Sequence, residues 1–241
     1  MKKVSDIHAI KIIFFITACY VGLWAIRIPT IKDQLQTDYI GVGYIMLSFA
    51  IGSIVAMIFA NALILKTSTK TILTYTLIAE GCLWLPVPFI HELWIFMIFS
   101  FVFGMSYGAF EIACNVYASN LEVREKRSMM SGFHAFWSLG VLFGSLFTSF
   151  FLEWNYSFIF NILIYVIILL PLSMYFVFCL ESQVEEKTED LSKKNIFFIW
   201  PLIIFLLALI AMANAITEGS VDAWGALYMR DYIKVDGFYI G

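Results

Sequence analysis

Seven apolar segments, each about as long as a membrane-spanning helix, constrain the fold of this chain more than any other feature. They cover residues 9–29, 40–65, 71–90, 93–118, 129–152, 157–180 and 196–217. A helix needs about 20 apolar residues to cross the hydrocarbon core of a bilayer, and only helices and closed barrels satisfy their backbone there. Hydrophobic residues make up 61% of the chain and charged residues 14%, which is typical of a membrane protein. The expected fold class is all-α and polytopic.

Lys and Arg residues are distributed unequally between the two ends of these segments. Eleven lie on one side, namely Lys2, Lys3, Lys11, Lys66, Lys70, Arg124, Lys126, Arg127, Lys187, Lys193 and Lys194. Four lie on the other side, namely Arg27, Lys32, Arg230 and Lys234. Because Lys and Arg accumulate in cytoplasmic loops, we expect a cytoplasmic N-terminus and, after seven spans, an external C-terminus.

One connecting stretch is much longer and more polar than the others. Residues 181–195, ESQVEEKTEDLSKKN, are interpreted as a cytoplasmic linker. The predicted organisation is a six-helix transmembrane bundle over residues 1–180, this linker, and a seventh helix with the start of an incomplete second bundle over residues 196–241. Trp24, Tyr39, Ile40 and Gly41 recur 200 positions later as Trp224, Tyr239, Ile240 and Gly241. This register arises either by chance or from an internal repeat that ends as an eighth helix begins.

The fourth segment carries an acid and an amide in its interior, within residues 103–120. At helical spacing Gly104, Gly108, Glu111 and Asn115 share one stripe. A charge at the centre of a membrane helix costs about 2.5–3.5 kcal/mol on insertion scales, so it is rarely kept without a use. The stripe is therefore either the wall of a translocation pathway or an unusually polar packing seam.

Motifs of soluble chemistry are missing from the sequence. It contains no Walker loop, no His/Cys metal cluster and no GxSxG elbow. The four cysteines lie in apolar segments without CxxC spacing, and the few basic residues are dispersed, which excludes nucleic acid as a partner. We therefore expect no enzyme and no cofactor. If the polar stripe of the fourth segment lines a translocation pathway, the energy for transport would come from an ion gradient, most simply of protons, given the buried acids.

Residues 104–146, GMSYGAFEIACNVYASNLEVREKRSMMSGFHAFWSLGVLFGSL, resemble helices 4 and 5 of the major facilitator superfamily. The similarity is to a bacterial branch of largely uncharacterised inner-membrane transporters, related in architecture to sugar/proton symporters. That branch carries an acid and, four positions on, an Asn, then a basic loop and a Ser-x-Phe-His-x-x-x-Ser-Leu-Gly run. The matching positions here are Glu111, Asn115, Ser131, Phe133, His134, Ser138, Leu139 and Gly140. Residues 24–33 and 218–231 agree as well.

Three features depart from the superfamily pattern. The acid in its fourth helix is most often Asp, whereas Glu111 is one methylene longer. The superfamily's cytoplasmic loop between helices 2 and 3 usually contains a Gly, an Asp and two basic residues, whereas residues 61–70 here keep only the lysines. Twelve helices with their loops need roughly 380–400 residues, and this chain has 241.

The resemblance implies a proton-coupled secondary transporter of a small solute, a symporter working by alternating access in the bacterial inner membrane. Its partners would be the solute, protons and the lipid bilayer. The main alternative is a truncated or split fragment without transport activity of its own, whose C-terminal bundle is missing or separately encoded. A seven-helix receptor or membrane enzyme is a weaker alternative. A sugar, an organic acid or an expelled drug would each fit as the substrate.

The predicted substrate and proton pathway comprises Glu111, Asn115, His134, Arg27, Trp24, Glu218 and Asp222. Glu111 would titrate and Asn115 would bind the cargo, or the two form a structural hydrogen-bonded pair.

Each of the other predicted pathway residues has a second interpretation. His134 relays protons or binds substrate, or it packs near the basic loop. Arg27 faces a cavity or reaches the headgroups. Glu218 and Asp222 line a cavity, or the helix ends before them. For Glu80, in the third segment, we expect a structural or pairing role.

Overall fold

All regular secondary structure in the described residues, 5–182 and 202–240 of the computed structural model, is helical. The long helices are α1 (Asp6–Gln34), α2 (Tyr39–Lys66), α3 (Thr69–Trp84), α4 (Leu93–Glu125), α5 (Met130–Glu153), α6 (Phe158–Cys179) and α7 (Leu202–Leu227). The shorter helical elements are η1 (Val87–Phe89), between α3 and α4, and η3 (Tyr228–Ile233) and η4 (Gly237–Ile240), after α7. Seven helices among the described residues are long and apolar enough to span a membrane, which confirms the predicted fold class.

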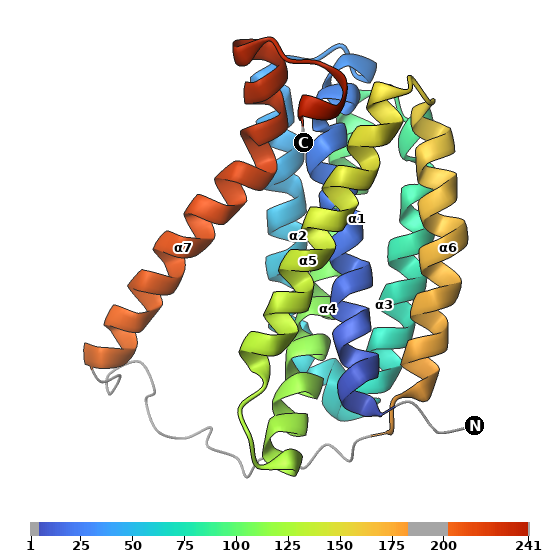
Figure 1. The fold of residues 1–241 in the computed structure, drawn as a ribbon. Coiled ribbons are helices and arrows are strands. Elements are labelled where there is room, and N and C mark those ends of the chain that lie inside the picture. Colours follow the sequence, from blue (N-terminus) through green and yellow to red (C-terminus); the bar gives the residue numbers. More distant parts are fainter. Residues whose placement is uncertain (1–4, 183–201, 241) are drawn as a thin grey trace.

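The first six helices form a bundle around α1 (Figure 1). Helix α1 packs against α5 and α6, α2 against α4, and α3 against α4 and α6. Helices α1 and α5 approach closely because two glycines of α5 face the backbone of α1. Gly140 and Gly144 of α5 lie against Phe15 and Cys19 of α1. Without a Cβ atom at these two positions, the backbones of α1 and α5 can pack closely.

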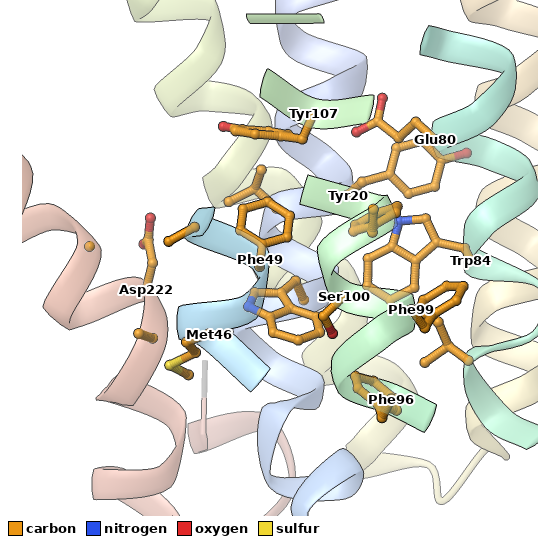
Figure 2. Close-up of a pocket in the computed structure, with 17 residues that line it drawn as sticks. Tyr20, Met46, Phe49, Glu80, Trp84, Phe96, Phe99, Ser100, Tyr107 and Asp222 are labelled. Carbon is orange, nitrogen blue, oxygen red and sulfur yellow. The ribbon is translucent and has the colours of Figure 1, made fainter. Parts of the chain in front are cut away.

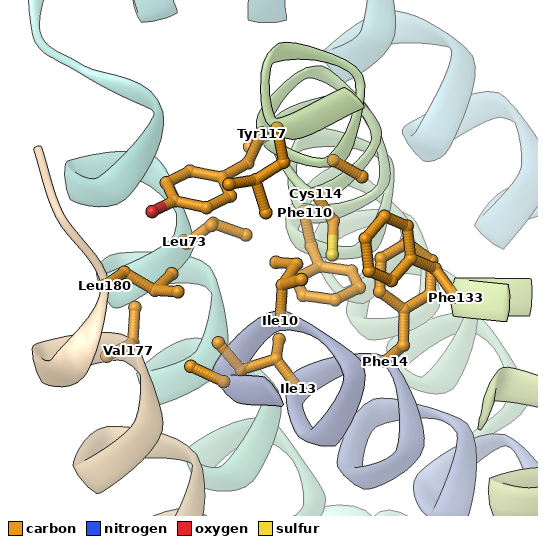
Figure 3. Packing of buried hydrophobic residues seen from close by; sticks show 14 of the residues in the cluster. Ile10, Ile13, Phe14, Leu73, Phe110, Cys114, Tyr117, Phe133, Val177 and Leu180 are labelled. Carbon is orange, nitrogen blue, oxygen red and sulfur yellow. The ribbon is translucent and has the colours of Figure 1, made fainter. Parts of the chain in front are cut away.

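Two apolar clusters fill the bundle interior, and one of them lies near the N-terminal end of α1. Figure 3 shows Ile10 and Phe14 of α1 packed with Leu73, Phe133 and Val177. The side chains come from α1, α3, α5 and α6, and Phe110, Cys114 and Tyr117 of α4 complete the cluster. This end of the bundle is therefore densely packed.

Charged groups tie the helix ends beside this cluster. Arg124 at the end of α4 donates to Asp6 at 2.9 Å, and the amide of Glu181 donates to the same carboxylate at 3.1 Å. Glu122 accepts from the amide of Met130 at 2.7 Å. Its carboxylate therefore satisfies a backbone donor at the start of α5 that has no partner within the helix.

Helix α7 differs from the predicted seventh segment, 196–217. Residues 183–201, with most of the predicted linker and the first residues of that segment, lie outside the described residues, so the domain division stays a prediction. The observed helix runs on to Leu227. Its polar residues fit the helix because the hydroxyls of Thr217 and Ser220 donate to carbonyls one turn earlier, at 3.0 and 2.6 Å. The alternative that the helix ends before Glu218 is therefore wrong.

Helix α7 touches the bundle at one end only. Figure 1 shows it against the bundle near its C-terminal end and far from the bundle at its N-terminal end, which lies on the same side as the chain's N-terminus. Every residue from Leu202 to Val221 is exposed, whereas Ala226 and Leu227 are buried. The space between α7 and the bundle thus widens toward the N-terminal side.

Candidate functional site

A cavity of about 350 Å³ lies between the bundle and α7, around the middle of the bundle helices. Its wall is largely aromatic, with Tyr20 and Trp24 from α1, Phe49 from α2, Trp84 from α3, and Phe103 and Tyr107 from α4. Figure 2 shows rings from these helices gathered around it. Two acids, Glu80 of α3 and Asp222 of α7, also line the cavity, and none of its described lining residues is Lys, Arg or His.

Trp84 is at the centre of the aromatic wall. Its ring stacks on Tyr20 with centroids 6.2 Å apart, and it meets Phe103 edge-on at 5.7 Å. Trp24 lies 6.4 Å from it in a tilted arrangement. The Tyr20 hydroxyl and Trp84 Nε1 are buried and have no hydrogen-bond partner among the described residues. Buried polar groups are normally paired, so these two atoms mark a polar spot in an otherwise apolar wall.

Glu80 lies in this wall, where we expected a structural or pairing residue. The residue is 7% exposed and also borders a much smaller cavity beside Ser106 and Tyr107. No ion pair involves it among the described residues. The buried Thr17 hydroxyl is its neighbour without meeting hydrogen-bond geometry. A buried carboxyl without a cationic partner is costly, and the position of Glu80 in the cavity wall makes it a candidate for ligand contact.

Two predicted pathway residues, Trp24 and Asp222, line the cavity. Glu111 and Asn115 do not; both are half-buried on α4, one and two turns beyond Tyr107 toward the open end. His134 of α5 is exposed and interacts electrostatically with Glu111. Its ring meets Phe14 edge-on at 5.7 Å, so it contacts both the predicted acid and the packed cluster.

Four acids surround Tyr107. Glu80 and Asp222 lie on its cavity side, and Glu111 and Glu218 lie outside the cavity. Glu218 itself is exposed on α7, one turn before Asp222. The predicted acids therefore lie around one tyrosine without forming a single cluster, and among the described residues no group of three or more His, Cys, Asp or Glu could hold a metal ion.

Arg27 does not belong to this site, which corrects both interpretations of it. The side chain is 3% exposed and lies between α1 and α6. Its Nε donates to Asn161 Oδ1 at 3.0 Å, and its guanidinium lies 5.3 Å from the Phe158 ring centroid. It neither lines the cavity nor reaches outward, because the amide and the ring of α6 hold it inside the bundle.

The polar stripe of α4 is also partly a packing seam. Gly104 faces the backbone of Phe49, and Gly108 faces that of Ser53, both on α2. The Ser53 hydroxyl donates to the Gly104 carbonyl at 3.0 Å. The glycines thus hold α4 against α2, so only Glu111 and Asn115 of the stripe stay candidates for the pathway.

The C-terminal end of α7 is tied to the bundle by an ionic group, here called the α1–η3 latch. Arg230 donates to both oxygens of Asp33 at 2.6 and 3.2 Å. Asp231 accepts from the Tyr39 hydroxyl at 2.9 Å and lies 3.7 Å from Lys32. The latch closes the end of the inter-helix space opposite to the open one.

Sequence reasoning missed Glu80, Trp84 and Tyr107 as cavity residues. A signal existed in their spacing, since Glu80 and Trp84 are four residues apart and Phe99, Phe103 and Tyr107 continue at the same interval on α4. It was hidden because aromatic residues, at 18% of the chain, occur on several faces of the helices.

The fold and site define a polytopic helical membrane protein with a cavity between a six-helix bundle and a further helix. A family model described as Major Facilitator Superfamily matches residues 12–241, and the chain belongs to this superfamily.

Two curated relatives are named as transporters. The uncharacterized transporter y4wD of Sinorhizobium fredii (strain NBRC 101917 / NGR234) is 24% identical over 240 residues, which cover 92% of this chain and 59% of that protein. An uncharacterized MFS-type transporter of Yersinia pestis is 28% identical over 145 residues, which cover 59% of this chain and 37% of that protein. The chain therefore spans about half the length of these relatives or less. No solved structure matches it.

Proposed function

We propose that the chain serves a secondary active transporter that moves a small solute by alternating access, coupled to protons. The observation that carries this proposal is the cavity at the middle of α1, α2 and α4, closed by the latch at one end and bounded by the diverging α7 at the other. A site near the bilayer midplane that is open to one face at a time is what alternating access requires.

The proposed membrane is the bacterial inner membrane, with the N-terminus in the cytoplasm. The unequal distribution of Lys and Arg supports this orientation. The open side of the cavity then faces the cytoplasm and the α1–η3 latch faces outward. In this arrangement the structure corresponds to an inward-open state, and release of the latch would accompany opening toward the outside.

Proton coupling is proposed for the acids around Tyr107. Glu111 lies between the cavity and the open end, beside His134, where a carboxyl can exchange protons with cytoplasmic water. Asn115, one turn further, would guide the solute, and Trp24 and Asp222 would contact it in the cavity. Glu218 would extend the acidic path along α7.

Proton coupling can be tested in proteoliposomes that contain the full chain and enclose a pH-sensitive dye. Sugars, organic acids and amines are added in turn to these vesicles and to protein-free vesicles, which correct for passive entry of weak acids and amines. Beyond that background, a coupled transporter changes the internal pH only with its own solute. In Glu111→Gln we expect this proton movement to be lost while exchange of labelled solute persists, because a neutral amide cannot carry a proton. Glu92→Gln, an exposed position just before α4, is the matched control. Full proton movement in folded Glu111→Gln would remove Glu111 from the mechanism.

We propose as the alternative to transport by the chain alone that it works only together with a second helical bundle, in which case the test above needs both parts. It is supported by the relatives, of which the chain spans 59% and 37%, and by the exposure of α7 from Leu202 to Val221. Proteoliposomes of the chain alone would then move no solute. Sequencing the DNA downstream of codon 241 and co-expressing any further apolar segments found there would restore transport. Transport by the chain alone contradicts this proposal.

A further inference from the structure

The cavity wall carries two carboxyl groups and no cationic side chain. Glu80 and Asp222 line it, and none of its described lining residues is Lys, Arg or His. Arg27 of α1 does not line the cavity and hydrogen-bonds Asn161 of α6 instead. A cation that enters this apolar space would stabilise an ionised carboxylate there, whereas an anion would find no cationic partner.

The aromatic wall suits a cation that carries apolar groups. Around Trp84, the Tyr20 ring is nearly parallel at 14°, the Trp24 ring is tilted by 60° and the Phe103 ring is nearly perpendicular at 81°. Rings in different orientations offer both faces and edges to one ligand. Trp and Tyr faces bind ammonium groups, and they do so best where water is excluded.

Two unpartnered polar atoms provide an independent sign of a ligand. Tyr20 is 3% exposed and Trp84 is 1% exposed, yet the Tyr20 hydroxyl and Trp84 Nε1 have no partner among the described residues. Figure 2 places both side chains beside Glu80 in the cavity wall. The hydroxyl can accept a hydrogen bond from a protonated amine, and the indole can donate one to an acceptor on the same ligand.

We propose that the cavity binds a small organic cation with aromatic or aliphatic substituents, for which Glu80 is the counter-charge and the aromatic wall around Trp84 the stacking surface. This inference rests on the proposed transport function and specifies its substrate class. A sugar would need many more hydrogen-bonding groups than this wall offers, and an organic anion would meet two carboxylates. The cavity volume of about 350 Å³ is at the small end of ligand sites.

The test is equilibrium binding to the purified full chain in maltoside micelles, measured by calorimetry. Benzyltrimethylammonium is compared with phenylmethanesulfonate, which has a similar size and the opposite charge, and with glucose. We expect saturable binding of the cation at least tenfold tighter than that of the anion or glucose. Glu80→Gln should weaken cation binding at least tenfold, and Trp84→Phe, which keeps a ring but loses the indole N–H, should weaken it less. Glu92→Gln, outside the cavity, should bind as the wild type does.

Equal or tighter binding of the anion or glucose, or unchanged cation binding in folded Glu80→Gln, would overturn the proposal. If Glu80→Gln does not elute as a folded monodisperse protein, the wild-type comparison and Asp222→Asn decide instead. Failure here is distinct from failure of transport. Proton movement with a sugar or an organic acid alone keeps the transporter and rejects the cation. Cation binding without transport of any solute, by the chain alone or with a second bundle, keeps the site and rejects the transporter.

Discussion

Replacing Gly104 by alanine should loosen the α2–α4 pair, because this glycine lets the two backbones touch. A Cβ atom built there would lie 2.9 Å from the carbonyl carbon of Phe49 and closer still to its oxygen. Both are backbone atoms, so no side-chain rotation relieves the overlap. The helices must separate instead, by a distance on the order of 1 Å, which forfeits up to about half of the attraction between the atoms concerned.

The expected cost follows from two opposing effects. Overpacking of a well-packed site costs about 1–3 kcal/mol. Alanine recovers up to about 1 kcal/mol because glycine is a poor helix former. Because the overlapping atoms of Phe49 are backbone and cannot rotate away, the upper part of that range applies, about 2–3 kcal/mol, and the net destabilisation of Gly104→Ala should be about 1–2 kcal/mol. Gly43 on α2 is the matched control, since nothing lies within 4 Å of a Cβ atom built there, and Gly43→Ala should be neutral or stabilising by up to about 1 kcal/mol.

The assay is unfolding of the purified chain by increasing SDS in maltoside micelles, followed by circular dichroism and tryptophan fluorescence. Gly104→Ala should unfold at a lower SDS fraction than the wild type, and Gly43→Ala at an equal or higher one. If the two variants unfold together, or if Gly104→Ala is the more stable, the α2–α4 contact is not the tight backbone seam described here.

Two further predictions concern the latch and the orientation. Arg230→Gln should lengthen and broaden the distance between spin labels at Gln36 and Asp236, while the free energy of unfolding changes by no more than about 1 kcal/mol because the ion pair with Asp33 is partly exposed. The double swap Asp33→Arg/Arg230→Asp should restore the short distance. An unchanged distance in Arg230→Gln would show that the latch does not hold η3 against α1. Topology reporters fused after Lys70 and Lys126 should behave as cytoplasmic and one after His91 as external, since Lys and Arg are concentrated on the first side; the reverse pattern would invert the proposed inward-open assignment.

The number and approximate bounds of the spans could be predicted from the sequence because the bilayer itself imposes length and apolarity. For α2 and α5 the expected and observed bounds differ by one residue at each end, with 40–65 against Tyr39–Lys66 and 129–152 against Met130–Glu153. The prediction failed at the end of α7, where the polar run after Thr217 lowers the hydropathy. Local hydroxyl–carbonyl bonds let the helix continue there, and hydropathy alone does not register them.

The site was harder to predict because these helices are apolar on nearly all sides. A helix in lipid needs no polar face, so periodicity does not tell which side points to a cavity. Trp24 and Asp222 were found from their residue types, yet Glu80 looked like a packing residue of an outer helix. Arg27 was misjudged because its partner, Asn161, is 134 positions away, and one sequence does not reveal such a contact.

The glycine seam and the cavity are two consequences of one constraint on α4. Gly104 and Gly108 must face α2, because only there does the absence of a Cβ atom permit backbone contact. That contact fixes the rotation of α4, and the residues just before each glycine, Phe103 and Tyr107, are thereby turned into the cavity wall. Tyr107 in turn lies within electrostatic range of all four acids, with Glu80 and Asp222 on the cavity side. A methyl group at Gly104 should therefore weaken ligand binding as well as stability, although no ligand would touch it.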